Sequence, residues 1–194
     1  MNSLTFIPFV LFVLFVVILC YCVWTDLTTH KIKNIAVLLV LVVGLVFQGL
    51  NAGLHGVFDG CLGLLIGFVF FLPGYIKRIT SAGDVKLVAA CGMFLGVSDT
   101  LVAIAVTLIS GAVFALCVLA YKGALVDSLR RWRFAMLALF YRNADVYIPP
   151  AKDDVAAEYF PYALAIACGS LFALVNGPLY TVYGVGFIDV LNRF

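Results

Sequence analysis

Charged residues are scarce in this chain. Lys, Arg, Asp and Glu make up 11% of the 194 residues, whereas hydrophobic residues make up 65%. Ordinary soluble domains carry about 25% charged residues, so the composition excludes that class. Charge is absent from a series of apolar runs, most of them close to the roughly 17–25 residues that span a bilayer: 5–25, 35–50, 60–76, 87–98, 100–121 and 159–180. We therefore predict an all-α integral membrane protein with six transmembrane helices, which forms a single domain over residues 1–194.

Two further absences narrow the interpretation. No basic residue precedes the first apolar run, which is also too long for a signal-peptide core, so we expect it to remain a membrane helix. No two cysteines have CxxC spacing, which argues against a zinc site and against a disulfide framework. We interpret the cysteines as small buried hydrophobic residues: Cys20, Cys22, Cys61, Cys91, Cys117 and Cys168.

Lys and Arg are distributed unevenly among the connections between these runs. All of them except Arg193 lie in alternate connections, within 31–33, 77–86 and 122–152. Because the face of a membrane protein that is rich in Lys and Arg is the cytoplasmic one, these connections are predicted to lie inside. Both termini are then periplasmic, together with the short connections that carry Asp59 and Asp99.

The long polar segment 122–158 is predicted to be a cytoplasmic loop. An Arg cluster at 130–133 lies beside apolar residues that recur at steps of three or four, which is typical of a helix on a membrane surface: Leu125, Leu129, Trp132, Met136 and Phe140. A basic linker that only fixes the orientation of the chain would fit the same residues.

Asp26 and Asp84 lie where apolar runs meet the predicted cytoplasmic face. Asp26 ends the first run, within WTDLTTHKIKN, and Asp84 opens the fourth, within SAGDVKL. Ionisable groups at such positions are costly and often functional, although anchoring at the interface would also explain them. Asp26 follows the carboxyl end of a predicted helix and Asp84 begins one, so the helix macrodipoles favour an ionised Asp84 and a protonated Asp26.

The segments AGDVKL and DLTTHKIKN resemble two motifs of the type IV prepilin peptidases, a family of membrane aspartic proteases. In that family an Asp follows a helix, a basic stretch ends in Ile-Pro-Asn, and a Gly-x-Gly-Asp-Val-Lys-Leu motif comes later. Asp26 and Asn34 occupy the matching positions of the first motif. Gly83, Asp84 and Lys86 occupy those of the second.

The chain departs from the family pattern at two positions. Ser81 stands where the first Gly of the second motif is usual, and Lys33 stands where Pro is usual. Pro161 is similar to the proline that starts the last helix in the family. Larger members carry a cytoplasmic insertion with paired CxxC cysteines and methylate the new amino terminus. This chain lacks the insertion and is similar to the compact members that serve Tad-type (Flp) pili.

The resemblance implies an aspartic endopeptidase of the bacterial inner membrane. It would cleave the leaders of type IV or Flp-type prepilins and pseudopilins after a Gly, at the cytoplasmic face. Asp26 and Asp84 would form a dyad that shares one proton, activates water and polarises the scissile carbonyl. Four residues would support the dyad: Gly83, Lys86, Asn34 and Pro161. The expected partners are the substrates, membrane lipids and pilus assembly machinery, with no cofactor, metal or nucleic acid.

Other residues indicate packing and anchoring. Gly63 and Gly67, and Gly92 and Gly96, form two GxxxG pairs, which predict close packing of the third and fourth spans. Lys86 lies two residues beyond the second carboxylate, so on a helix it faces elsewhere and is expected to anchor at the interface; contact with the dyad is the alternative.

Two other functional classes stay open. Asp26 and Asp84 could relay ions in a small ion-coupled transporter or channel, because acids within membranes mark ion pathways. Neither lies at mid-bilayer, however, and no pair of interrupted helices suggests an inverted repeat. A non-catalytic scaffold of a pilus or secretion machine is the third class.

Overall fold

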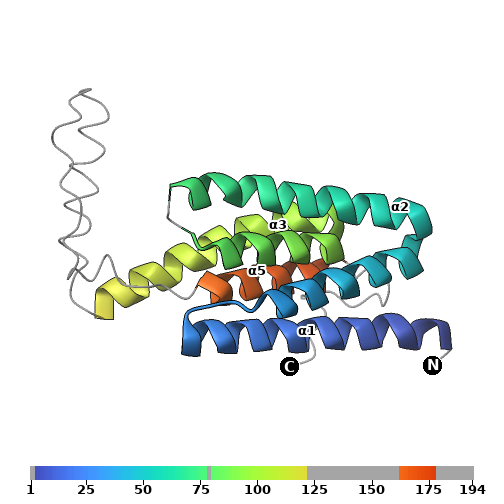
Figure 1. Cartoon of the computed structure of the whole chain (residues 1–194), viewed down its shortest axis with the longest axis horizontal. Helices are drawn as coiled ribbons and strands as arrows, with labels where there is room; N and C mark the ends of the chain where they lie inside the picture. The colour runs from blue at the N-terminus through green and yellow to red at the C-terminus, as the bar shows by residue number, and fades with distance from the viewer. Residues whose placement is uncertain (1–2, 78–79, 122–161, 178–194) are drawn as a thin grey trace, which may run out of the picture. The chain divides into compact units, whose positions relative to one another are not determined.

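The computed structural model describes residues 3–77, 80–121 and 162–177, and these ranges are mostly helical (Figure 1). Within them the chain forms α1 (Ser3–Thr29), α2 (Asn34–Ile76), α3 (Ala82–Tyr121) and α5 (Tyr162–Asn176), and no strand. The predicted all-α class is confirmed. The surface helix predicted within 122–158 lies outside the described residues.

The described helices are apolar on their outer faces. Three are long and apolar enough to cross a membrane, namely Ile7–Thr29, Asn34–Ile76 and Ala82–Val118, and α5 is a shorter apolar helix. Large hydrophobic side chains stand exposed along them, for example Leu38 at 59% and Phe58 at 68%. Water-soluble monomers rarely expose apolar surface on this scale, so these faces fit contact with lipid, as the composition predicts.

The chain divides into two compact units. The first comprises residues 1–111 together with 161–194, and the second comprises residues 112–160. Every contact described below lies within the first unit, which contains α1, α2, the larger part of α3, and α5. Of the second unit, the described part is 112–121, the end of α3.

Both α2 and α3 are interrupted by residues that leave helical geometry. Ala52 and Gly53 do so in α2, and Gly96 does so in α3, with φ 79° and ψ −178°. Gly53 and Gly96 have positive φ, which costs glycine little because it lacks a Cβ. Figure 1 shows the chain turning back at both interruptions, so that the two arms of each helix run in opposite directions.

Side chains from α2 bond the backbone on both sides of the interruption in α3. Nε2 of Gln48 donates to the carbonyl oxygen of Phe94 over 3.1 Å, and Oδ2 of Asp59 accepts from the N–H of Val97 over 3.4 Å. The sequence places Asp59 and Asp99 in connections, but both lie within helices. These bonds satisfy backbone groups at the interruption of α3. Helix resumes directly after Gly96, so Asp99 lies in the second arm of α3.

Glycines bring α2 and α3 into close contact. A Cβ added at Gly63 would overlap the carbonyl oxygen of Gly92, and one at Gly92 would overlap that of Gly63. A Cβ at Gly67 would lie 3.0 Å from the carbonyl oxygen of Val88. The close packing predicted from the GxxxG pairs is therefore confirmed.

An aromatic stack joins α3 to α1 and α2. The ring of Phe94 lies 4.2 Å from that of Phe15 and 4.3 Å from that of Phe47, measured between centroids. Phe94 and Phe15 are completely buried. Together with the glycine contact, this stack fixes the start of α3 relative to the end of α1, where the two candidate carboxylates lie.

Candidate active site

The fold buries Asp26 and Asp84 at the same end of the helices. Asp26 lies in the last turn of α1 and is 1% exposed, and Asp84 lies in the first turn of α3 and is 3% exposed. Their carboxyl groups are near enough to interact electrostatically. Two like charges in a buried site disfavour joint ionisation, so this arrangement favours one proton shared by the pair.

Asp84 and Ser81 form a capping box at the start of α3. The N–H of Ser81 donates to Oδ2 of Asp84 over 2.9 Å, and the N–H of Asp84 donates to Oγ of Ser81 over 3.2 Å. This reciprocal pair satisfies two backbone donors that a helix start leaves without partners. Ser81, which departs from the family pattern, thus helps to hold the carboxylate in place.

The second carboxylate oxygen of Asp84, Oδ1, takes no part in the capping box. Oδ1 is buried and has no hydrogen-bond partner among the described residues. An unpaired buried oxygen costs about 1–3 kcal/mol, and a role in a reaction is one of the explanations for such an atom. Oδ2 is engaged by Ser81, so Oδ1 is the oxygen of Asp84 that remains available for a hydrogen bond to a substrate.

Asp26 contacts the start of α5. Its Oδ2 accepts a hydrogen bond from the N–H of Ala163 over 3.3 Å. Asp26 is thus at the positive end of α5 as well as the negative end of α1, while Asp84 is at the positive end of α3. The dipole of α5 opposes that of α1 at Asp26, so the macrodipoles no longer favour ionisation of one carboxyl group over the other. The sequence did not predict this contact with α5.

The segment between α1 and α2 packs against the start of α3. A Cβ at Gly83 would lie 3.1 Å from Cβ of Ile32, so glycine lets this segment approach closely. Nζ of Lys86 donates to Oδ1 of Asn34 over 3.4 Å at the surface. Gly83, Lys86 and Asn34 therefore lie together beside the dyad, and Lys86 is exposed, as expected of an interfacial residue.

Lys33 has a backbone geometry that proline would also adopt. It is the N-cap of α2 with φ −71° and ψ 129°, and proline fixes φ near −65°. Its Nζ lies 5.7 Å from the centroid of the Tyr21 ring on α1. The second departure from the family pattern thus leaves the path of the chain compatible with the usual residue.

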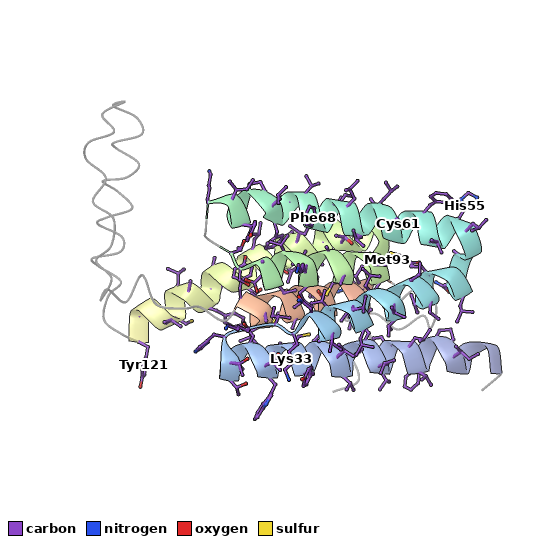
Figure 2. All side chains as sticks on the ribbon, viewed as in Figure 1. Lys33, His55, Cys61, Phe68, Met93 and Tyr121 are labelled. Carbon is purple, nitrogen blue, oxygen red and sulfur yellow. The ribbon has the colours of Figure 1, made fainter. Side chains whose placement is uncertain are left out.

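The other two acids that the structure describes lie away from the dyad. Asp59 and Asp99 interact electrostatically with each other, beside the interruption in α3. Figure 2 shows Lys33 and His55 at opposite ends of the helices, and the interruptions lie at the His55 end. The described residues contain no group of three or more His, Cys, Asp or Glu that could hold a metal ion. Pro161 lies outside the described residues.

The sequence reasoning missed Tyr162 and Ala163. Ala163 acts through its backbone N–H, which nearly every residue possesses, so no side-chain pattern could reveal it. The phenol of Tyr162 interacts electrostatically with Asp84. The sequence feature that could have revealed Tyr162 is its polar aromatic ring near the start of an apolar run.

Comparison with known protein families identifies a match. The sequence model of the type IV leader peptidase family matches residues 13–116, which is more than half of the chain and includes Asp26 and Asp84. No curated protein and no solved structure matches the chain significantly.

Proposed function

This chain belongs to the type IV leader peptidase family, and on that premise we propose that it is a prepilin leader peptidase of the aspartic type. The observation that carries the proposal is the buried pair of Asp26 and Asp84. Two carboxyl groups from different helices, in electrostatic contact and shielded from water, match what aspartic proteolysis requires.

The pair supplies both proton transfers of peptide hydrolysis. The ionised carboxylate takes a proton from water while the water oxygen bonds to the scissile carbonyl carbon. The protonated carboxyl group gives its proton to the carbonyl oxygen, which yields a gem-diol. The C–N bond then breaks as the nitrogen takes a proton from the first carboxyl group. A gem-diol hydroxyl returns its proton to the second, so the dyad is restored.

We propose six membrane crossings, formed by α1, the two arms of α2, the two arms of α3, and α5. A straight α2 of 43 residues would be about 65 Å long, roughly twice the ~30 Å hydrocarbon core, so an arm on each side of the interruption suits the membrane better. Lys31, Lys33, Lys77 and Lys86 lie at the dyad end, which the positive-inside rule assigns to the cytoplasm.

The proposed substrates are type IV or Flp-type prepilins and pseudopilins of the bacterial inner membrane. Such a substrate has a basic leader followed by an apolar helix, so its cleavage point lies at the membrane boundary. Asp26 and Asp84 lie at ends of apolar helices, at the matching depth. Cleavage after Gly and a role beside the Tad-type pilus machinery follow from the family resemblance and the compact form of the chain.

Co-expression with prepilins of the same genome tests the function. The wild type should remove the leader, seen as a shift on a gel, whereas Asp26→Asn and Asp84→Asn should remove none. Asp99→Asn, at the other end of the helices, is the matched control and should retain cleavage. Near wild-type cleavage by either dyad variant would exclude the two-carboxylate mechanism. Ion flux through liposomes that contain the wild type would instead favour the transporter class.

A thiol-labelling experiment tests the proposed orientation. A single cysteine introduced at Thr29, in a cysteine-free background, should resist an impermeant thiol reagent in intact cells. One at Asn51, near the interruption of α2, should react. The reverse pattern would place the dyad on the outer face.

A further inference from the structure

The start of α5 contacts Asp26 and lies near enough to Asp84 to interact with it electrostatically. The N–H of Ala163 donates to Oδ2 of Asp26 over 3.3 Å, and the phenol of the adjacent Tyr162 interacts electrostatically with Asp84. Both residues lie beyond 13–116, the range that matches the family. No role is therefore assigned to Tyr162 by that match.

The ring of Tyr162 is held from two sides. It packs edge-on against Phe71 of α2, with centroids 6.0 Å apart and an interplanar angle of 63°. On the side of α3, a Cβ at Gly111 would lie 3.2 Å from Cε2 of Tyr162 and 3.4 Å from its hydroxyl oxygen. A side chain at residue 111 would therefore crowd the ring and its hydroxyl.

A phenolic hydroxyl adds to this site a group that the dyad lacks. The carboxyl groups hold and transfer protons, and the hydroxyl is a hydrogen-bond donor that stays protonated at neutral pH. Donors that are fixed in place beforehand stabilise a carbonyl oxygen most as it becomes tetrahedral, since they need no reorganisation. The packing of Tyr162 between α2 and α3 provides this fixation, within electrostatic reach of Asp84.

We propose that Tyr162 is a third catalytic residue, whose hydroxyl donates a hydrogen bond to the scissile carbonyl oxygen of the substrate beside Asp84. The proposal rests on the peptidase function above. The scissile carbonyl group of the substrate would then lie between the start of α3 and the start of α5.

Tyr162→Phe tests this role, because phenylalanine keeps the ring packing and removes only the hydroxyl. With the prepilin that the wild type cleaves, kcat should fall about tenfold or more and KM should stay within about twofold. Tyr75→Phe, the same change at an exposed tyrosine near the end of α2, should leave both unchanged. Wild-type kcat in Tyr162→Phe would overturn the proposal.

Gly111→Ala provides a second, independent test through the position of the hydroxyl. The added methyl group should displace the hydroxyl and lower kcat in the wild-type background, yet have little further effect in the Tyr162→Phe background. Equal losses in both backgrounds would indicate a structural role only and overturn the proposal. Failure of the wild type to cleave any prepilin would overturn the proposed function and this role with it. Full cleavage by Tyr162→Phe would overturn this role alone.

Discussion

The backbone N–H of Ala163 hydrogen-bonds Oδ2 of Asp26 over 3.3 Å, so a candidate catalytic carboxylate also satisfies the first turn of α5. Asp26 therefore has a structural function that can be separated from its chemistry. The asparagine amide oxygen can accept the same hydrogen bond, whereas alanine cannot.

We expect Asp26→Asn and Asp26→Ala to abolish cleavage alike but to differ in stability. Loss of an oxygen that caps a helix start costs about 0.5–2 kcal/mol, so Asp26→Ala should unfold at lower denaturant than Asp26→Asn. SDS titration of the protein in detergent micelles, followed by circular dichroism, measures the difference. Equal stability of the two variants would show that the contact with Ala163 contributes nothing.

The capping box of Ser81 and Asp84 predicts an order of stability at position 81. Replacing a capping serine with alanine costs about 0.5–2 kcal/mol, and with glycine only a few tenths. Ser81→Gly, which restores the usual family residue, should therefore be close to wild type in SDS titration, and Ser81→Ala should be less stable. Both keep the backbone N–H that bonds Oδ2 of Asp84, so prepilin cleavage should change little. A large loss of cleavage in Ser81→Gly would show that the hydroxyl takes part in catalysis.

The sequence revealed the parts of the site whose signal is local. Asp26 and Asp84 each lie in a short motif that can be recognised in the sequence. Both are buried, at the end of α1 and the start of α3. The interruption at Gly96 falls within the short connection predicted around Asp99. The residue that turns was not predicted, because Gly96 also completes a GxxxG pair. The contact of Ala163 was missed as well, since a backbone donor has no sequence signature.

The backbone geometry of Lys33 predicts that proline is tolerated at the N-cap of α2. The φ of −71° suits proline, and no described hydrogen bond uses the N–H of Lys33. The gain of about 0.4–1 kcal/mol from a less flexible unfolded chain should offset the loss of a Lys33–Tyr21 contact worth about 0.5–1 kcal/mol. Lys33→Pro should therefore match the wild type in SDS titration and in cleavage.

The control for this substitution is Leu38→Pro, at an exposed position within the helix. Proline there removes a helical hydrogen bond and clashes with the preceding turn, at a cost of about 3 kcal/mol or more. Comparable destabilisation by Lys33→Pro would mean that the segment before α2 does not have the described geometry.

The contact of Gly63 with Gly92 predicts opposite effects of alanine at two glycines of α2. A methyl group at Gly63 would overlap the carbonyl oxygen of Gly92, so α3 must move away. Overpacking of this kind costs about 1–3 kcal/mol. At Gly49 the added Cβ would meet only Cγ2 of Val57, at 3.7 Å, and alanine should stabilise the helix by up to about 1 kcal/mol.

Gly63→Ala should therefore lower both the SDS midpoint and the rate of prepilin cleavage, whereas Gly49→Ala should retain the rate. The loss of rate follows because α3 carries Asp84, and a shift of α3 away from α2 moves this carboxylate relative to Asp26 on α1. Gly92→Ala should reproduce the effect from the other side of the contact. A Gly63→Ala enzyme with wild-type stability and rate would show that α2 and α3 do not meet at these glycines, and that the geometry of the dyad is set elsewhere.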